Sequence, residues 1–331
     1  MLDLAATATA AAPRIAFHDH GAEEESFRDA ALVGLSRADK AIPCRFLYDE
    51  AGSALFDLIC ELPEYYPTRT EMGILRAAAP EIARRVGPHA QLIELGSGSS
   101  VKVRLLLDAM TAPAAYIAVD VSREHLRRAA EALAAEVPDL HVAAVCADYM
   151  VDFPLPDLPP RGRRTAFFPG STIGNLEPDE ARAFLQLWAR RLGPGAAMII
   201  GVDLRKDAGV LNAAYDDAQG ITAAFSRNLL VRANRELEAN FPVDRFVHEA
   251  RYDEATGRVE IHLRSLDGAT VRVAGQDFAF TAGERIHVEH SYKYSIGQFQ
   301  DLAARCGFQA AAVFTDPDAL FSVHYLTTPE A

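Results

Sequence analysis

Apolar runs of strand length alternate with amphipathic segments of helical length between about Glu71 and Leu204. Such alternation predicts an α/β fold in which a parallel sheet is covered by helices on both faces. The runs are rich in β-branched residues, as expected of strands buried on two sides. The predicted strands are Leu92–Leu95, Tyr116–Val119, Val142–Cys146, Thr165–Phe168 and Ala197–Val202, with helices at Val101–Met110, Arg123–Glu136 and Pro178–Leu192.

After Lys206 the pattern changes. Two helical segments precede strands whose side chains alternate between apolar and polar, and the end of the chain resembles a return to the first sheet. An α+β segment is therefore expected to interrupt the α/β domain. The predicted elements are helices at Val210–Gly220 and Thr222–Leu237, a hairpin from Arg251 to Leu263 around Ala255-Thr256-Gly257, strands at Val271–Val273 and Ile286–Tyr292, a helix at Gln298–Cys306 and strands at Ala310–Asp316 and Leu320–Thr327.

The N-terminal part lacks this alternation. Two helical patterns flank Pro43 between Phe27 and Leu62, and the alanine-rich start shows no amphipathic spacing. We therefore expect three parts. They are a flexible tail at residues 1–20, a substrate-binding domain built from residues 21–69 and 206–293, and an α/β domain built from residues 70–205 and 294–331.

Composition narrows the class of partner. Half of the 331 residues are apolar and the net charge is −13, so a globular chain with a large core is expected, and nucleic acid or an anionic membrane is not expected as its partner. No apolar run reaches the roughly 20 residues that span a bilayer, and the start is not basic, which favours a cytoplasmic location. The four cysteines lack CxxC spacing and are interpreted as reduced core residues. A monomer that binds a small molecule is predicted.

The strand at Leu92–Leu95 ends in Gly96-Ser97-Gly98-Ser99, directly before a helix. Glycines here allow a sharp turn and a close approach of a ligand to the backbone, while the helix offers unpaired amide groups. A dinucleotide enzyme normally carries GxGxxG, but Val101 stands at the third glycine position, which favours a nucleotide-type cofactor without a pyrophosphate. A tight turn with no ligand would also explain the glycines.

Acidic residues follow the next two strands at the same predicted sheet edge. Asp120 ends its strand, where a carboxylate can accept hydrogen bonds from both ribose hydroxyls, and Asp148 follows the third strand, where it can accept from an adenine amino group. The ring of Tyr149 can pack on the base, and Lys102 can pair with a carboxylate. Each residue alone also fits a solvated surface position, but together they favour S-adenosylmethionine as the cofactor.

Several long motifs carry a resemblance to a known family. They are Tyr48-Asp49 before Gly52-Ser53, Leu62-Pro63-Glu64-Tyr65-Tyr66-Pro67-Thr68-Arg69-Thr70-Glu71, Glu94-Leu95-Gly96-Ser97-Gly98, Gly170-Ser171-Thr172-Ile173-Gly174-Asn175-Leu176, Tyr215-Asp216-Asp217 and Glu289-His290-Ser291. From about Phe46 onward the chain resembles the histidine Nα-methyltransferase family of ergothioneine biosynthesis.

The resemblance implies a Rossmann-like S-adenosylmethionine-dependent methyltransferase sheet with an inserted α+β substrate-binding domain. It also implies transfer of three methyl groups to the α-amino group of L-histidine, which gives hercynine, with S-adenosylhomocysteine as the second product and no metal. Other possibilities stay open. They are a same-fold N-methyltransferase acting on another α-amino acid or on a histidine derivative, a nucleotide-binding module without catalysis, and a dinucleotide oxidoreductase, against which the missing third glycine weighs.

The resemblance also assigns the substrate-binding residues. Asn175 and Tyr215 match the residues that hold the substrate carboxylate, and an amide and a phenol can bind an anion without adding a cation beside the sulfonium. Tyr65 matches a residue on the imidazole side. Glu289 and Ser291 match the pair that hydrogen-bonds the ring, and two residues that are two apart on a strand share a face.

Further positions complete the predicted site. Tyr48 matches a tyrosine near the reacting amine, where its oxygen can orient the lone pair and its ring can accommodate a methylammonium group. Ile261 stands where a better-known form of the family has methionine against the substrate ring, and the two side chains are similar enough in volume that we expect tolerance. The predicted cofactor residues are Gly96, Ser97, Gly98, Lys102, Asp120, Asp148, Tyr149 and Gly170.

Some of these positions have competing interpretations. Tyr65 would also serve in core or surface packing, and Glu289 would also fit a solvated strand position. Asn175 would also serve as a helix N-cap shortly before Pro178. His287 and Glu289, if they shared a strand face near His262, would allow a metal site. No third ligand has a recognisable spacing and alkylation by a sulfonium needs no metal, so no metal is expected.

Overall fold

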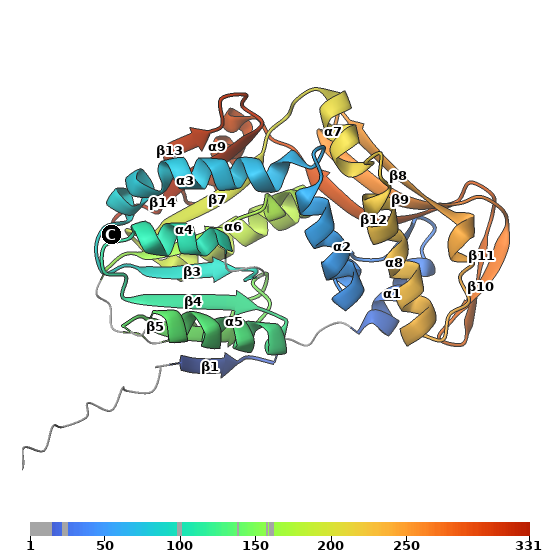
Figure 1. The fold of residues 1–331 in the computed structure, drawn as a ribbon, viewed down its shortest axis with the longest axis horizontal. Helices are drawn as coiled ribbons and strands as arrows, with labels where there is room; N and C mark the ends of the chain where they lie inside the picture. The colour runs from blue at the N-terminus through green and yellow to red at the C-terminus, as the bar shows by residue number, and fades with distance from the viewer. Residues whose placement is uncertain (1–14, 22–25, 98–100, 138, 157, 159–161) are drawn as a thin grey trace, which may run out of the picture. The chain divides into compact units, whose positions relative to one another are not determined.

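The computed structural model describes residues 15–21, 26–97, 101–137, 139–156, 158 and 162–331. The chain forms two compact units, Met1–Ala22 with Pro80–Phe167 and Glu23–Ala79 with Phe168–Ala331. Each unit is built on sheets with helices packed against them (Figure 1). These units divide the chain at other positions than the sequence suggests, so the division into a substrate-binding domain and an α/β domain stays a prediction.

The first unit is built on parallel strands separated by helices. Its elements are β1 (Ile15–Asp19), β3 (Gln91–Leu95), α4 (Val101–Ala109), β4 (Ala115–Asp120), α5 (Arg123–Glu136), β5 (His141–Cys146) and β6 (Arg164–Phe168). The strands run in the order β1-β5-β4-β3-β6. Strand β3 is buried along its whole length, and α5 packs on β4 and β5. The apolar runs therefore form the two-sided core that their pattern predicted.

Residues 15–19 correct the expectation of a flexible tail over residues 1–20. They form β1, which pairs in parallel with β5 along all five residues. Asp19 at its end forms an ion pair with Arg123 of α5. The strand is held at the sheet edge by backbone hydrogen bonds, which leave little trace in the side-chain pattern.

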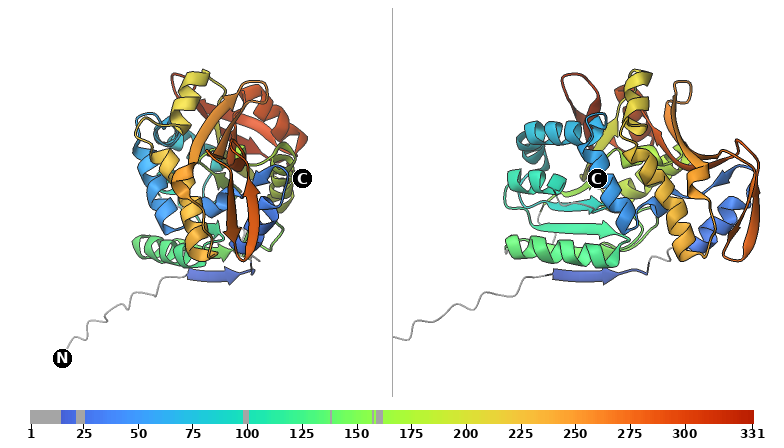
Figure 2. Two further views of the ribbon diagram at one scale, coloured as in Figure 1. Left: turned by 90° about the vertical axis from the view of Figure 1, so that its right-hand side faces the viewer. Right: turned by 45° about the vertical axis from the view of Figure 1, so that its right-hand side comes forward.

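The second unit contains two larger sheets and a hairpin. Its elements, of which α3 continues into the first unit, are α1 (Phe27–Leu35), β2 (Lys40–Ala41), η1 (Cys44–Leu47), α2 (Glu50–Glu61), α3 (Tyr66–Val86), η2 (Thr172–Asn175), α6 (Pro178–Leu192), β7 (Ala197–Asp203), α7 (Ala208–Tyr215), α8 (Ile221–Glu236), η3 (Val243–Arg245), β8 (Phe246–Asp253), β9 (Arg258–Ser265), β10 (Ala269–Val273), β11 (Gln276–Phe280), β12 (Arg285–Tyr292), α9 (Ile296–Arg305), β13 (Gln309–Thr315) and β14 (Phe321–Thr327). In one sheet, strands β7, β14 and β13 lie antiparallel in this order, and α9 packs on β13. The other has the order β2-β12-β9-β8, with α7 and α8 against β8 and β9 (Figure 2).

Most elements follow the predicted pattern. Helices α5 and α6 have the predicted bounds, and the α/β fold class with an added α+β part is confirmed. Helix α3 was not predicted. It begins at Tyr66 directly before Pro67, and a proline in the first turn of a helix sacrifices no helical hydrogen bond. The sequence around Pro67 therefore starts a helix. No helix in the described ranges combines the length and apolar character needed to cross a membrane.

Candidate active site

In the first unit, the turn after β3 has the backbone shape that the glycines predict. Gly96 has φ +74°, in the left-handed region that favours glycine, and its N–H donates to the carbonyl of Val119 at 2.9 Å. A Cβ at Gly96 would lie 3.8 Å from the ring of Tyr149, so that ring lies against the turn. Ser97 follows and is buried. Gly98 lies outside the described residues.

Asp120 and Asp148 lie at the carboxyl edge of the same sheet. Asp120 ends β4 and pairs with Cys146 at the end of β5, two residues before Asp148. Each carboxylate accepts a hydrogen bond from the backbone N–H two residues further along, at 2.8 Å and 2.7 Å. The structure therefore brings Gly96, Asp120, Asp148 and Tyr149 to one edge. This set suits a cofactor that presents ribose hydroxyls and a base, as S-adenosylmethionine does.

The structure places the two other predicted cofactor residues, Lys102 and Gly170, in different surroundings. Lys102 lies in the first turn of α4, near the buried Glu94. Burial raises the pKa of Glu94 to about 7, while a hydrogen bond from Tyr116 and the charge of Lys102 oppose the rise. Gly170, in the second unit, has φ +81° and donates its N–H to both carboxylate oxygens of Glu71 at 2.9 Å. The backbone N–H of Gly170 is therefore already hydrogen-bonded within the protein.

In the second unit, an irregularity of β12 decides where its side chains point. His287 pairs with His262 and Glu289 pairs with Ile261, so Val288 has no partner of its own on β9. Such a β-bulge places two residues of one strand opposite one residue of the other. It therefore shifts the alternation of side chains by one position along β12.

The bulge separates two kinds of side chain on the two faces of this sheet. Glu289 lies opposite Ile261, which belongs to the apolar core, and Ser291 shares that face. His287 and His290 lie on the other face, with ring centroids 5.5 Å apart. The metal interpretation placed His287 and Glu289 on one face, and the bulge shows this to be wrong. Among the described residues, no group of three or more His, Cys, Asp or Glu side chains is placed to hold a metal ion.

Asn175 reaches Glu289 because η2 packs closely on β12. A Cβ at Gly174 would lie 2.6 Å from the carbonyl oxygen of Tyr292, so glycine permits this approach. Asn175 Nδ2 then lies 3.4 Å from Glu289 Oε1. The competing interpretation of Asn175 as a helix cap is wrong, because Glu177 is the N-cap of α6 and forms a capping box.

Tyr215, at the end of α7, and Ser291 meet at a buried lysine. The Tyr215 hydroxyl lies 3.2 Å from Ser291 Oγ, and Lys293 Nζ donates to the two oxygens at 2.7 Å and 2.8 Å. Sequence reasoning did not single out Lys293. A signal was present, because Glu289, Ser291 and Lys293 recur at every second position of one extended segment.

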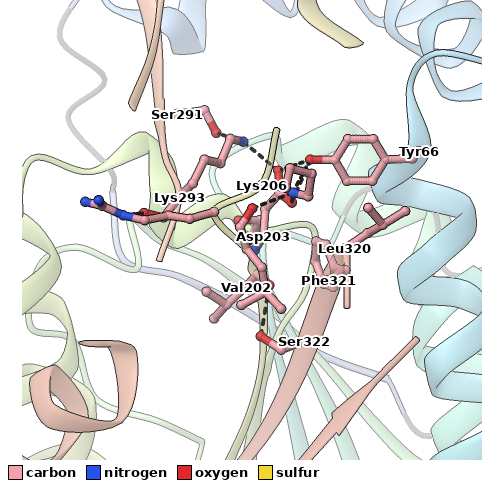
Figure 3. A network of polar contacts seen from close by, with 12 residues as sticks. Tyr66, Val202, Asp203, Lys206, Ser291, Lys293, Leu320, Phe321 and Ser322 are labelled. Atoms are coloured by element: carbon pink, nitrogen blue, oxygen red, sulfur yellow. Dashed lines mark hydrogen bonds and ion pairs between the residues drawn. The ribbon is translucent and has the colours of Figure 1, made fainter. Parts of the chain in front are cut away.

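Lys293 belongs to a buried polar network (Figure 3). Asp203, at the end of β7, lies 2.7 Å from Lys293 Nζ and 2.6 Å from Lys206 Nζ. It also accepts a hydrogen bond from the Tyr66 hydroxyl at 2.8 Å. Sequence reasoning missed Asp203 and Lys206 as well. Asp203 ends an apolar strand just as Asp120 does, and this similarity was the available signal.

Aromatic rings surround the other predicted substrate residues. Tyr48 packs between Phe56 and Phe225 with ring centroids 5.4 Å and 5.3 Å away, and Tyr65 lies 6.0 Å from Tyr215 in an edge arrangement. Although 40% of Tyr48 is exposed, desolvation of the phenol among these rings raises its pKa well above the usual value, and the negative charge of Glu289 adds to the rise. The phenol of Tyr48 is therefore neutral at physiological pH.

The carboxyl group of Glu289 is strongly perturbed. Burial raises its pKa from 4.5 to about 7, although the charge of Lys293 and the hydrogen bond from Asn175 oppose the rise. A raised pKa in the folded state means that the group stabilises the fold at pH values below 4.5, and that this contribution is lost as the pH rises through 7.

Glu289→Gln is therefore expected to raise the free energy of unfolding at pH 8, by about 2 kcal/mol, and by much less at pH 4.5. Urea unfolding at the two pH values measures the difference. Glu284→Gln is a control of opposite sign, because Lys40 lowers the pKa of Glu284 through a hydrogen bond. An effect of Glu289→Gln that grew as the pH fell would contradict the assignment.

Comparison with known proteins supports one family. A family model described as "Histidine-specific methyltransferase, SAM-dependent" matches residues 27–328. The chain is 43% identical over 304 residues to the histidine N-alpha-methyltransferase of Mycolicibacterium smegmatis, covering 90% of this chain and 94% of that protein. It is 42% identical over 289 residues to the enzyme of the same name from Mycobacterium tuberculosis (85% and 89% covered). It is 28% identical over 298 residues to ergothioneine biosynthesis protein 1 of Schizosaccharomyces pombe (86% and 39% covered).

The glycine turn, the two carboxylates at the sheet edge and the family match together define an S-adenosylmethionine-dependent methyltransferase. The chain belongs to the histidine-specific methyltransferase family. The predicted family, the histidine substrate class and the methyl donor are thereby confirmed. The roles of individual residues stay predictions.

Proposed function

We propose that the protein transfers three methyl groups to the α-amino group of L-histidine and so produces hercynine, the first step of ergothioneine biosynthesis. One observation carries the proposal. Glu289 and Ser291, which can hydrogen-bond a ring, share a strand face and contact Asn175 and Tyr215, which can hold a carboxylate. This set suits an α-amino acid with a polar ring. The names of the relatives from M. smegmatis and S. pombe support the same substrate and pathway.

The remaining residues shape the ring side and the amine side of the proposed complex. Ile261 lies opposite Glu289 and presents an apolar surface, and the ring of Tyr65 lies beside Tyr215. Tyr48 is neutral, so its oxygen can accept an N–H of the amine and orient the nitrogen lone pair. A neutral phenol is a weak proton acceptor, and solvent is the proposed acceptor of the proton that each step releases.

S-adenosylmethionine supplies a methyl group that its sulfonium already activates. The task of the protein is therefore to hold an unprotonated amine in line with that group, and positioning of this kind accounts for much of an acceleration. The amine nitrogen bonds to the methyl carbon as the carbon–sulfur bond breaks, and a proton leaves the nitrogen before the next transfer. After the third transfer the nitrogen has no lone pair, so the reaction stops.

Incubation with S-adenosylmethionine and each common amino acid tests the function. Mass spectrometry should show a gain of three methyl groups on histidine and little gain on the others. Preferred methylation of a different amino acid, or of a partly methylated histidine with no reaction of histidine itself, would favour the alternative of a same-fold N-methyltransferase with another acceptor.

Tyr48→Phe is expected to slow each of the three transfers by about tenfold, the cost of one hydrogen bond at the reacting nitrogen. Rates of the first, second and third methyl gain, followed by mass spectrometry, measure the effect. Val33→Ala is a surface control, because Val33 is 64% exposed. Three unchanged rates in Tyr48→Phe would rule out the orienting role.

The proposed enzyme acts as a monomer in the cytoplasm, on a small molecule and without nucleic acid or membrane. The net charge of −13 supports the absence of nucleic acid and membrane partners, because it disfavours binding to phosphate backbones and anionic lipids. Sedimentation equilibrium tests the monomer, and a mass of two chains would contradict it.

A further inference from the structure

Lys293 is a buried lysine that the proposed mechanism does not use. The residue is 2% exposed, and its Nζ lies 2.7 Å from Tyr215 Oη, 2.8 Å from Ser291 Oγ and 2.7 Å from Asp203 Oδ2. An ammonium group has three N–H donors and no acceptor. The three neighbours therefore account for all three donors, and Figure 3 shows the lysine between Ser291 and Asp203.

These contacts fix the direction of two hydroxyl groups. Tyr215 and Ser291 each accept an N–H from Lys293, so each keeps its own proton for another partner. Their oxygens are 3.2 Å apart, and one hydroxyl can donate to the other until a substrate offers a better acceptor. Burial raises the pKa of Tyr215, although Lys293 opposes the rise. The phenol therefore stays protonated and can donate to a carboxylate.

The lysine also brings positive charge behind these hydroxyls. Asp203 lies between Lys293 and Lys206, so this part of the network holds two basic groups and one acid. Burial opposes both charges, but the Asp203 carboxylate raises the pKa of Lys293, and the two ammonium groups lower the pKa of Asp203. Both are therefore ionised. Lys293 therefore places a positive charge directly beside the two hydroxyl groups that suit an anion, while Glu289 and Asp316 are further acids whose charges act on the two lysines.

We propose that Lys293 is a positioning residue for the substrate carboxylate. It directs the hydroxyl protons of Tyr215 and Ser291 toward the substrate and places a positive charge behind them. The proposal rests on the proposed function, since it takes histidine as the ligand of this site. Because Lys293 acts through Tyr215, its loss should weaken the hold on the carboxylate in the ground state and the transition state alike.

Two variants separate this role from the general effect of losing a buried charge. Lys293→Met and Lys206→Met each remove one ammonium group from Asp203 and leave the other, so each variant retains one buried ion pair. Of the two lysines, Lys293 contacts Tyr215 and Ser291, whereas Lys206 contacts Tyr66. Initial rates are measured on L-histidine and on L-histidinamide, which lacks the carboxylate charge.

Lys293→Met is expected to raise KM for histidine about 30-fold, with less than about a threefold change in kcat. Its KM for histidinamide should rise several-fold less, because the neutral amide loses no charge interaction and any effect on the ring contact of Ser291 is common to both substrates. Lys206→Met should leave the preference for histidine over histidinamide unchanged. Calorimetric binding of S-adenosylmethionine checks that both variants are folded.

Equal losses on the two substrates, or equal changes of KM in the two variants, would overturn the proposal. If Lys293→Met does not fold, Lys293→Gln, which keeps a polar amide, is compared in the same way and should show a smaller shift in the same direction. Absence of histidine methylation by the unaltered protein would overturn the proposed function and this inference together. Histidine methylation with no special effect of Lys293 would overturn the inference alone.

Discussion

Replacing Glu289 by alanine should lower kcat/KM for L-histidine by about 100-fold or more, because a buried site built to hydrogen-bond a polar group discriminates strongly by that bond. The ionised carboxylate would accept the imidazole N–H, and its removal leaves that donor without a partner. L-Phenylalanine makes no such bond, so its low kcat/KM should change by less than about threefold. Initial rates on the two amino acids, followed by mass spectrometry, give the comparison.

Glu260→Ala provides the matched control for this experiment. Glu260 is an acid of the neighbouring strand β9 that lies opposite His290, on the other face of the same sheet. Its loss should alter histidine kcat/KM by less than about twofold, since surface changes away from a site have small effects. Equal losses of activity on histidine and phenylalanine after Glu289→Ala would remove Glu289 as the source of ring selectivity.

Asp203→Ala should lower the free energy of unfolding by about 3–5 kcal/mol, the usual cost of removing one partner from a buried ion pair. Asp203 is fully buried, and its removal leaves the ammonium groups of Lys206 and Lys293 without their shared anion. Tyr66 also loses the acceptor of its hydroxyl. Urea unfolding at neutral pH measures the change.

The exposed ion pair of Asp277 with Arg272 supplies the contrast. Its side chains are 53% and 63% exposed, so Asp277→Ala should cost less than about 1 kcal/mol. If Asp203→Ala also lowered the free energy of unfolding by less than about 1 kcal/mol, the buried network would contribute little to stability.

The sequence predicted those parts of the fold that depend on local apolar periodicity. Helices α5 and α6 were placed with their observed bounds, because an apolar stripe and a clear stop signal define each. Strand β1 and the start of α3 were missed for a physical reason. An edge strand depends on backbone pairing with a distant strand, and Pro67 is compatible with a loop as well as with a first helical turn.

The candidate site was predictable to a similar degree. Asp120 and Asp148 could be found because the carboxyl ends of parallel strands meet at one edge. The contact between Lys293 and Asp203 could not be predicted in the same way, because the burial of a lysine depends on partners that lie far away in the sequence. The shared face of Glu289 and Ser291 was expected from simple alternation, which holds because the bulge lies before both residues.

The unpaired Val288 makes the face to which Glu289 points depend on chain length as well as on the identity of the side chain. A strand residue points to one face or the other according to the number of residues since the last irregularity. A relative with the same acid but a regular strand would direct it toward the face that here holds His287 and His290. During evolution, gain or loss of one residue at this point would exchange the side chains that this strand presents on each face of the sheet in a single step. An acid transplanted between such relatives would therefore have to be moved together with the bulge.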